Sequence, residues 1–132
     1  MHKILIMICA VLMIPSLSNA CGGISIKGNS GTSYCLSKHT MNWYSAYAWC
    51  DAQEMALIDL TSVCESSTGC SELNLSSDEK DHIENNGGTL DPVWTDTSGS
   101  KGHAQAYVVA LNGGYLFGFY GRTVYSQPAL CK

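Results

Sequence analysis

The sequence has few charged residues and no cluster of basic ones. Only 14% of the 132 residues are charged, with 7 Lys and Arg against 11 Asp and Glu. Nucleic-acid binding needs Lys and Arg gathered against phosphates, so we expect no nucleic-acid partner. Low charge combined with 13 Gly also favours a loop-rich domain containing β-structure over a helix bundle.

A long apolar run is absent except near the N-terminus. Ile4–Ile14 is uninterrupted, Pro15 ends it, and Ser18-Asn19-Ala20 places small residues where a signal peptidase cleaves. The pattern predicts a signal peptide over residues 1–20 and one mature domain over 21–132. The run is shorter than the ~20 residues that span a bilayer, so we expect no transmembrane segment.

Export would place the protein outside the cell, in a periplasm or at a cell surface. Loss of Lys3 with the leader would change the net charge from −4 to −5. Cys21 directly follows the predicted cleavage point, where bacteria can attach a lipid anchor. The lipidation signal has a branched apolar residue where Ser18 stands, so ordinary cleavage fits better than lipoprotein anchoring.

The patterns of common catalytic and metal sites are also missing. The sequence has no Gly-x-Ser-x-Gly elbow and no C-x-x-C pair, and its histidines have no ligand spacing. A glycosidase needs two carboxylates held ~5–10 Å apart, and no pattern fixes such a pair. We therefore expect no enzyme, no cofactor and no bound metal.

Cysteine is plentiful by comparison. One of the 7 Cys leaves with the leader, and an even number remains in a small exported chain. Such a set indicates three disulfides, although six cysteines allow 15 pairings and the spacing alone selects none. The remaining cysteines are Cys21, Cys35, Cys50, Cys64, Cys70 and Cys131.

Local patterns predict an N-terminal hairpin and two short helices. Alternation and a Gly-rich turn predict the hairpin over residues 21–38. Asn42 is a good N-cap, and the helical stripe that follows should face the core. Ser76 and Glu79 match a capping box and predict the second helix. The stripe consists of Trp43, Ala46, Tyr47 and Cys50.

The C-terminal part reads as short antiparallel strands. Residues 104–111 and 115–120 are β-capable, and Asn112-Gly113-Gly114 between them is a strong turn signal. Residues 125–131 predict a last strand, and Ala56-Leu57-Ile58 predicts another. Residues 61–102, which include the second predicted helix, are mostly polar, and we expect a long loop region there.

These pieces together resemble a C-type lectin-like domain. Met41–Gln53 is similar to the first helix of that family, Ser76–Glu79 to the start of the second, and Val93-Trp94-Thr95 to the central aromatic strand. Ala129-Leu130-Cys131 resembles the terminal strand. The resemblance implies an α+β fold with two short helices, small antiparallel sheets and a long polar loop region, stapled by disulfides.

The resemblance also implies the disulfide pairing. It joins Cys50 to Cys131 and places Cys21–Cys35 across the N-terminal hairpin, which leaves Cys64–Cys70 as a local clip. The calcium and sugar motifs of the family do not carry over. Asp91-Pro92-Val93 is the nearest Pro tripeptide and lacks the second oxygen ligand, and no Trp-Asn-Asp occurs.

We therefore expect a secreted, non-catalytic recognition module that binds a glycan or a protein surface without calcium. The alternative is a structural or accessory subunit of a cell-surface assembly that has no small ligand. Exposed aromatics are common binding anchors, and loops on a rigid scaffold carry binding sites. The candidate ligand-binding residues are Asp91, Trp94, Asp96, Tyr107, Tyr115 and Tyr120, although Trp94 also fits a core position.

Overall fold

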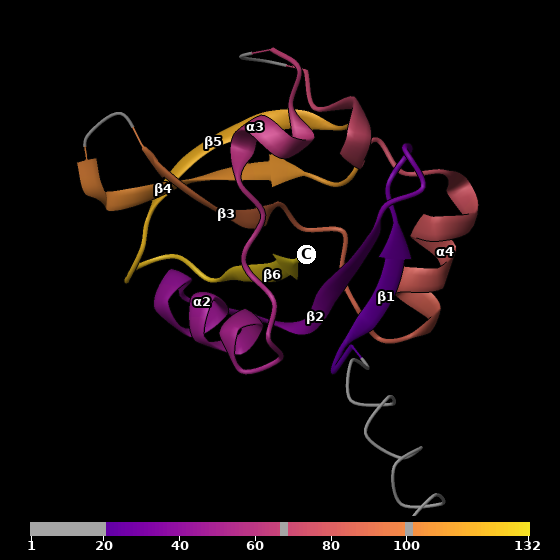
Figure 1. Ribbon diagram of the computed structural model, residues 1–132, viewed down its shortest axis with the longest axis horizontal. Helices are drawn as coiled ribbons and strands as arrows, with labels where there is room; N and C mark the ends of the chain where they lie inside the picture. Colours follow the sequence, from indigo (N-terminus) through magenta and orange to yellow (C-terminus); the bar gives the residue numbers. More distant parts are fainter. Residues whose placement is uncertain (1–20, 67–68, 100–101) are drawn as a thin grey trace, which may run out of the picture.

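The computed structural model describes residues 21–66, 69–99 and 102–132 as an α+β domain with three disulfides (Figure 1). The predicted signal peptide, residues 1–20, lies outside the described residues. The helical segments are α2 (Trp43–Asp51), α3 (Leu60–Val63), the 3-10 turn η2 (Ser71–Leu73) and α4 (Ser77–Asn85). The strands are β1 (Ile24–Lys27), β2 (Ser33–Met41), β3 (Val93–Gly99), β4 (Gly102–Ala110), β5 (Tyr115–Gly121) and β6 (Gln127–Cys131).

The strands form one sheet in the order β1-β2-β6-β3-β4-β5. The predicted hairpin is present as β1 and β2, and β6 pairs antiparallel with β2. On its other side β6 meets β3 in parallel at a single pair, Trp94 opposite Ala129, and β3, β4 and β5 then run antiparallel. The last strand of the chain therefore joins an N-terminal half-sheet to a C-terminal one.

Successive residues of a strand point to opposite sides of the sheet, and the central strands are covered on both sides by apolar clusters. Leu36 and Leu130 face one apolar cluster, which also receives Ile83 from α4. Cys35 and Cys131 face the other cluster, which lies under α2. In Figure 1, α2 lies beside β6 and α4 flanks β1 at the opposite end of the domain.

Helix α2 begins where the sequence predicts. The Asn42 Oδ1 accepts a hydrogen bond from the Ser45 N–H at 2.9 Å and caps the first turn. Trp43 and Cys50 are buried as expected, but Tyr47 is 48% exposed, so its predicted place in the core is wrong. A nine-residue helix lying on a sheet buries only a narrow stripe, and Tyr47 stands at its margin, stacked on Trp43.

Residues 61–102 hold more regular structure than the expected long loop region. Besides the predicted second helix, α4, they contain most of α3 and all of η2. The predicted aromatic strand at residues 93–95 extends as β3 through Ser98 and Gly99. The predicted strand over residues 56–58 is instead a single bridge between Leu57 and Cys131. Helices of three or four residues are too short to leave a readable hydrophobic period.

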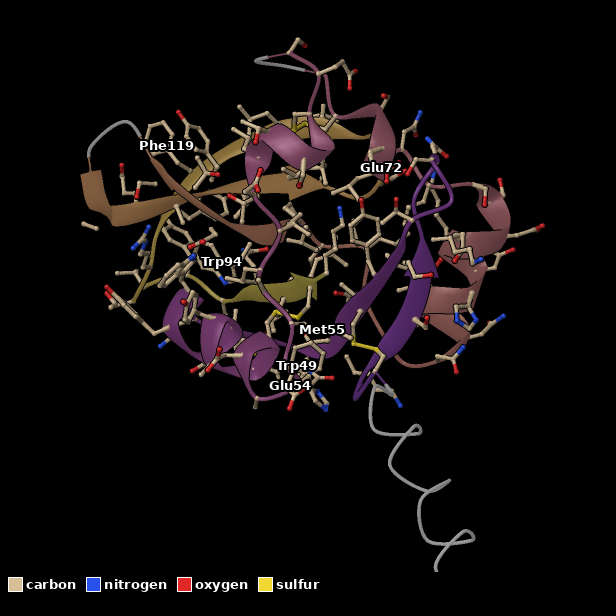
Figure 2. The ribbon with its side chains drawn as sticks, viewed as in Figure 1. Trp49, Glu54, Met55, Glu72, Trp94 and Phe119 are labelled. Carbon is tan, nitrogen blue, oxygen red and sulfur yellow. A yellow bond between two sulfur atoms is a disulfide. The ribbon has the colours of Figure 1, made fainter. Side chains whose placement is uncertain are left out.

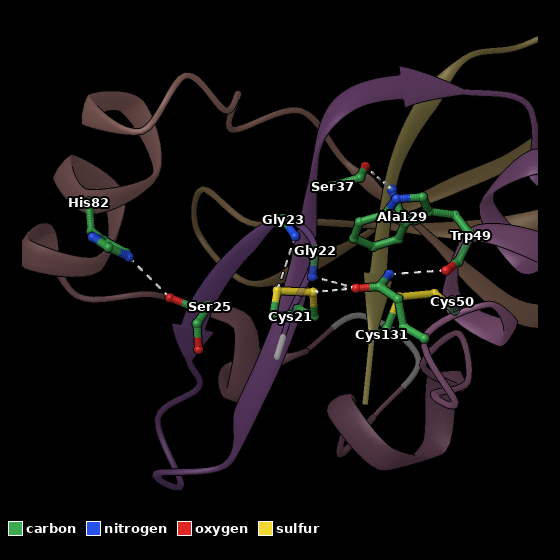
Figure 3. The surroundings of a disulfide bond; sticks show 12 residues. Cys21, Gly22, Gly23, Ser25, Ser37, Trp49, Cys50, His82, Ala129 and Cys131 are labelled. Atoms are coloured by element: carbon green, nitrogen blue, oxygen red, sulfur yellow. Dashed lines mark hydrogen bonds between the residues drawn. A yellow bond between two sulfur atoms is a disulfide. The ribbon is translucent and has the colours of Figure 1, made fainter. Parts of the chain in front are cut away.

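All three disulfides have the pairing implied by the resemblance. Cys50–Cys131 ties α2 to β6, and Cys21–Cys35 closes the N-terminal hairpin. Because Cys35 is the register partner of Cys131, these two disulfides lie next to each other (Figure 3). On the far side of the hairpin, the His82 ring of α4 hydrogen-bonds the Ser25 carbonyl at 3.1 Å.

A half-buried carboxylate, Glu72, fixes the β1–β2 turn to η2. Glu72 accepts hydrogen bonds from the Ser30 N–H at 2.7 Å, the Ser30 hydroxyl at 2.6 Å and the Tyr34 hydroxyl at 2.7 Å. Partial burial opposes ionisation of Glu72, but the hydrogen bonds from Ser30 and Tyr34 outweigh it and lower its pKa. Burial, together with the bond to Glu72, raises the pKa of Tyr34.

This contact should make stability depend on acidity. A lowered pKa in the folded state means that Glu72 stabilises the fold above its ordinary pKa of 4.5, and that this contribution is lost as the pH falls below it. We expect Glu72→Gln to lower the free energy of unfolding at pH 7 by about 1–2 kcal/mol. Urea unfolding at pH 7 and pH 3 tests this, because the difference between the two proteins should shrink as the pH falls through the lowered pKa of Glu72. A difference of the same size at both pH values would show that the charge is not responsible.

Candidate functional site

Most of the strongly exposed large apolar side chains in the described part of the chain gather on one surface. Tyr44, Tyr47 and Tyr125 are 52%, 48% and 48% exposed, and Val124 is 79% exposed. Tyr115, at 46%, lies apart beside the β4–β5 turn. We call the surface that carries Tyr44, Tyr47, Val124 and Tyr125 the aromatic surface. It comprises Trp43, Tyr44, Tyr47, Tyr120, Arg122, Val124 and Tyr125.

Trp43 organises the half of the aromatic surface that belongs to α2. Its ring is stacked with that of Tyr47 at 5.3 Å and meets Tyr44 edge-on at 5.1 Å. Its indole N–H donates to the Thr95 carbonyl of β3 at 2.9 Å, which fixes the ring against the sheet. The two tyrosines therefore pack against an indole ring that is held in place.

The other half comes from the turn between β5 and β6. Tyr120 and Tyr125 are stacked at 4.4 Å with their planes 21° apart. The Arg122 carbonyl accepts the backbone N–H of Trp43 at 3.0 Å, one of the donors that a helix start leaves unpaired. The turn and α2 are thus joined directly, although nearly 80 residues separate them in the sequence.

Arg122 lies beneath this surface as a buried cation. It is 8% exposed, and its guanidinium carbon lies 4.0 Å from the Trp43 ring centroid, a cation–π arrangement. Nη2 donates to the Ser98 hydroxyl at 3.0 Å, while Nε is buried without a hydrogen-bond partner. Within the described part of the chain Arg122 has no carboxylate partner.

The structure does not bring the predicted ligand-binding residues together. Of the six, only Tyr120 belongs to the aromatic surface. Tyr107 lies on the opposite face of the sheet, where its ring meets Phe119 edge-on at 5.7 Å (Figure 2). Asp91 is exposed and accepts from the Thr89 hydroxyl at 2.9 Å, and Asp96 is exposed on β3.

Trp94 is a core residue and offers no surface to a ligand. It is completely buried between α2 and the sheet, and its indole N–H donates to the Met41 carbonyl at 2.8 Å (Figure 2). The prediction that Trp94 binds a ligand is therefore wrong. Its neighbours Val93 and Thr95 are buried too, because β3 is a central strand with both of its faces covered.

Sequence reasoning missed most of the aromatic surface. Tyr44, Arg122, Val124 and Tyr125 were not considered as site residues, and Tyr47 was assigned to the core. One signal was available: two short segments, residues 43–47 and 120–125, combine several aromatics with one Arg. Aromatic residues and Arg are the types enriched in binding surfaces. That the two segments meet could be learned only from the fold.

A groove lies beside the two neighbouring disulfides, Cys21–Cys35 and Cys50–Cys131. Its volume is about 420 Å³, within the ~300–1,000 Å³ of small-molecule sites. Apart from the Lys132 ammonium, its side chains carry no charge, and it brings no set of polar groups to one point. It is lined by Cys21, Gly23, Ser25, Ser33, Tyr34, Cys35, Met55, Cys131 and Lys132.

Among the described residues, no group of three or more His, Cys, Asp or Glu side chains is placed to hold a metal ion. No helix within them has both the length and the apolar character needed to cross a membrane. Comparison of the sequence with models of protein families found no match, and a search of curated proteins found none either.

Proposed function

We propose that this chain is a secreted, non-catalytic recognition module with a C-type lectin-like fold, and that it binds carbohydrate through the aromatic surface. Support for the fold assignment comes from the element order of hairpin, helix, second helix and antiparallel strands. The last strand returns beside the first half-sheet and carries the cysteine bonded to α2. Three disulfides and the predicted leader fit an exported protein.

The aromatic surface is the observation that supports binding. Its three half-exposed tyrosines and Val124 offer roughly 400 Å² of apolar area, taking ~200 Å² for a whole aromatic side chain. The largest apolar patch on a typical monomer is about 300–600 Å², and patches of this kind are often functional. The aromatic surface is therefore large enough to be a binding site.

The same area suits a small ligand. A stable protein interface buries about 800 Å² on each partner, of which somewhat over half is apolar, so a protein partner would have to extend beyond these four side chains. One or two sugar rings, by contrast, would be covered by it. The C–H face of a pyranose is flat and apolar and packs on an aromatic ring, while the tyrosine hydroxyls can bond the hydroxyl groups of the sugar.

Calcium is not needed for this mode of binding. The contacts come from aromatic rings and hydroxyl groups, and none of them requires a calcium ion coordinated by six to eight oxygen atoms. We therefore expect binding to be the same in EDTA and in millimolar calcium.

A glycan-binding experiment with paired tyrosine variants tests the proposal. The double variant Tyr44→Ala, Tyr47→Ala should bind the best glycan of an array at least about tenfold more weakly, because each lost stacking contact costs on the order of 1 kcal/mol. Calorimetry of the mature domain with that glycan measures the loss.

Tyr115→Ala is the matched control, because Tyr115 is exposed to a similar degree but lies outside the aromatic surface. It should bind normally. If no glycan binds, or if the Tyr115 change weakens binding as much as the double variant, the proposal is wrong. The first of these outcomes would leave the structural-subunit alternative.

A further inference from the structure

The aromatic surface covers a positive charge that the protein itself does not neutralise. Burying a guanidinium is costly unless a carboxylate or a full set of hydrogen bonds compensates it. Arg122 is more than nine-tenths buried, its Nε has no partner, and its one side-chain hydrogen bond is to the neutral Ser98 hydroxyl. The Trp43 ring supplies a cation–π contact but no negative charge.

This arrangement is not forced by a shortage of acidic residues. The chain has 11 Asp and Glu against 7 Lys and Arg, yet none of the described ones pairs with Arg122. The side-chain hydrogen bond of Arg122 to a described residue is made by Nη2, and the residue keeps 8% exposure. An anion would therefore meet the guanidinium at Nη1.

We infer that the ligand of the aromatic surface is an acidic sugar whose anionic group pairs with Arg122. This inference rests on the proposed function, since it assumes that a sugar stacks on Tyr44 and Tyr47. The pyranose would lie on the tyrosines, and its carboxylate or sulfate would accept a charge-assisted hydrogen bond from Nη1 of the guanidinium. A charge pair at a partly buried site is stronger than one in open water.

The experiment compares sugars that differ only in charge. The unaltered mature domain is titrated with a uronic-acid oligosaccharide, with the methyl ester of the same oligosaccharide, and with a sulfated oligosaccharide. The acid should bind about tenfold or more tightly than its ester, as expected for a hydrogen-bonded charge pair. The relative strength of the sulfated sugar distinguishes carboxylate from sulfate as the preferred anion.

Arg122→Met identifies the residue responsible. Met fills a similar volume without charge, so the variant should bind acid and ester equally, at the level of the ester with the unaltered protein. Tyr115→Ala is again the control and should keep the preference for the acid. Near-ultraviolet circular dichroism checks that Arg122→Met is folded. If it is not, the comparison of acid with ester on the unaltered protein still decides the inference.

The outcomes separate this inference from the proposed function. Equal binding of acid and ester by the unaltered protein would overturn the acidic-sugar inference alone, because sugar binding would remain. A preference for the acid that survives in folded Arg122→Met would overturn the role of Arg122. Absence of binding to every sugar would overturn both the inference and the proposed function.

Discussion

Replacing Cys50 and Cys131 together by Ala should lower the free energy of unfolding by about 4–5 kcal/mol and leave much of the protein unfolded at 37 °C. The disulfide joins residues 81 positions apart, so it removes many conformations from the unfolded chain. Both cysteines are completely buried and lie in the cluster under α2. Small domains have about 5–15 kcal/mol of stability in total, so this loss is a large fraction.

The Cys64–Cys70 disulfide provides the matched control. It closes a separation of only 6 residues, for which the same reasoning gives about 2 kcal/mol. The double variant Cys64→Ala, Cys70→Ala should therefore stay folded, with a looser segment between α3 and η2. Guanidinium unfolding of both double variants measures the difference. Equal losses in the two would show that loop closure is not the main source of the stabilisation.

The local structure of this fold could largely be predicted from the sequence. The Asn42 and Ser76 caps and the Asn112-Gly113-Gly114 turn each depend on the chemistry of a few neighbouring residues. Gly113 and Gly114 adopt positive φ, at 104° and 63°, whereas Asn112 does not, so the positive φ begins one residue later than the Asn-Gly signal indicates. The disulfide pairing followed from the resemblance, because the spacing alone leaves 15 pairings open.

The candidate site could not be predicted in the same way. Whether Tyr47 is buried depends on how far α2 extends over β6, which no local pattern records. The meeting of Trp43 with the turn that carries Arg122 depends on β6 returning beside the first half-sheet. Tyr107 and Tyr120 looked equivalent in the sequence, yet β4 and β5 place them on opposite faces. The alternation of side chains predicts which residues share a face of a strand, but only the packing of the whole fold decides which face is exposed to solvent.

Trp94→Ala should lower the free energy of unfolding by about 3–5 kcal/mol, the usual cost of removing a large aromatic side chain from a core. Trp94 is among the largest completely buried side chains of the described residues and lies at the one pair that joins β3 to β6. Its loss would leave a cavity exactly where the two half-sheets meet, and only part of that cavity could collapse.

A second substitution separates lost volume from the lost hydrogen bond. Trp94→Phe keeps much of the ring but leaves the Met41 carbonyl without its indole donor, so it should cost about 1–3 kcal/mol. Asp96→Asn, two residues along β3, changes an exposed side chain and should cost less than about 0.5 kcal/mol. Thermal unfolding of the three variants measures these costs. If folded Trp94→Phe lost sugar binding while its stability stayed unchanged, Trp94 would contact the ligand and its assignment to the core would be wrong.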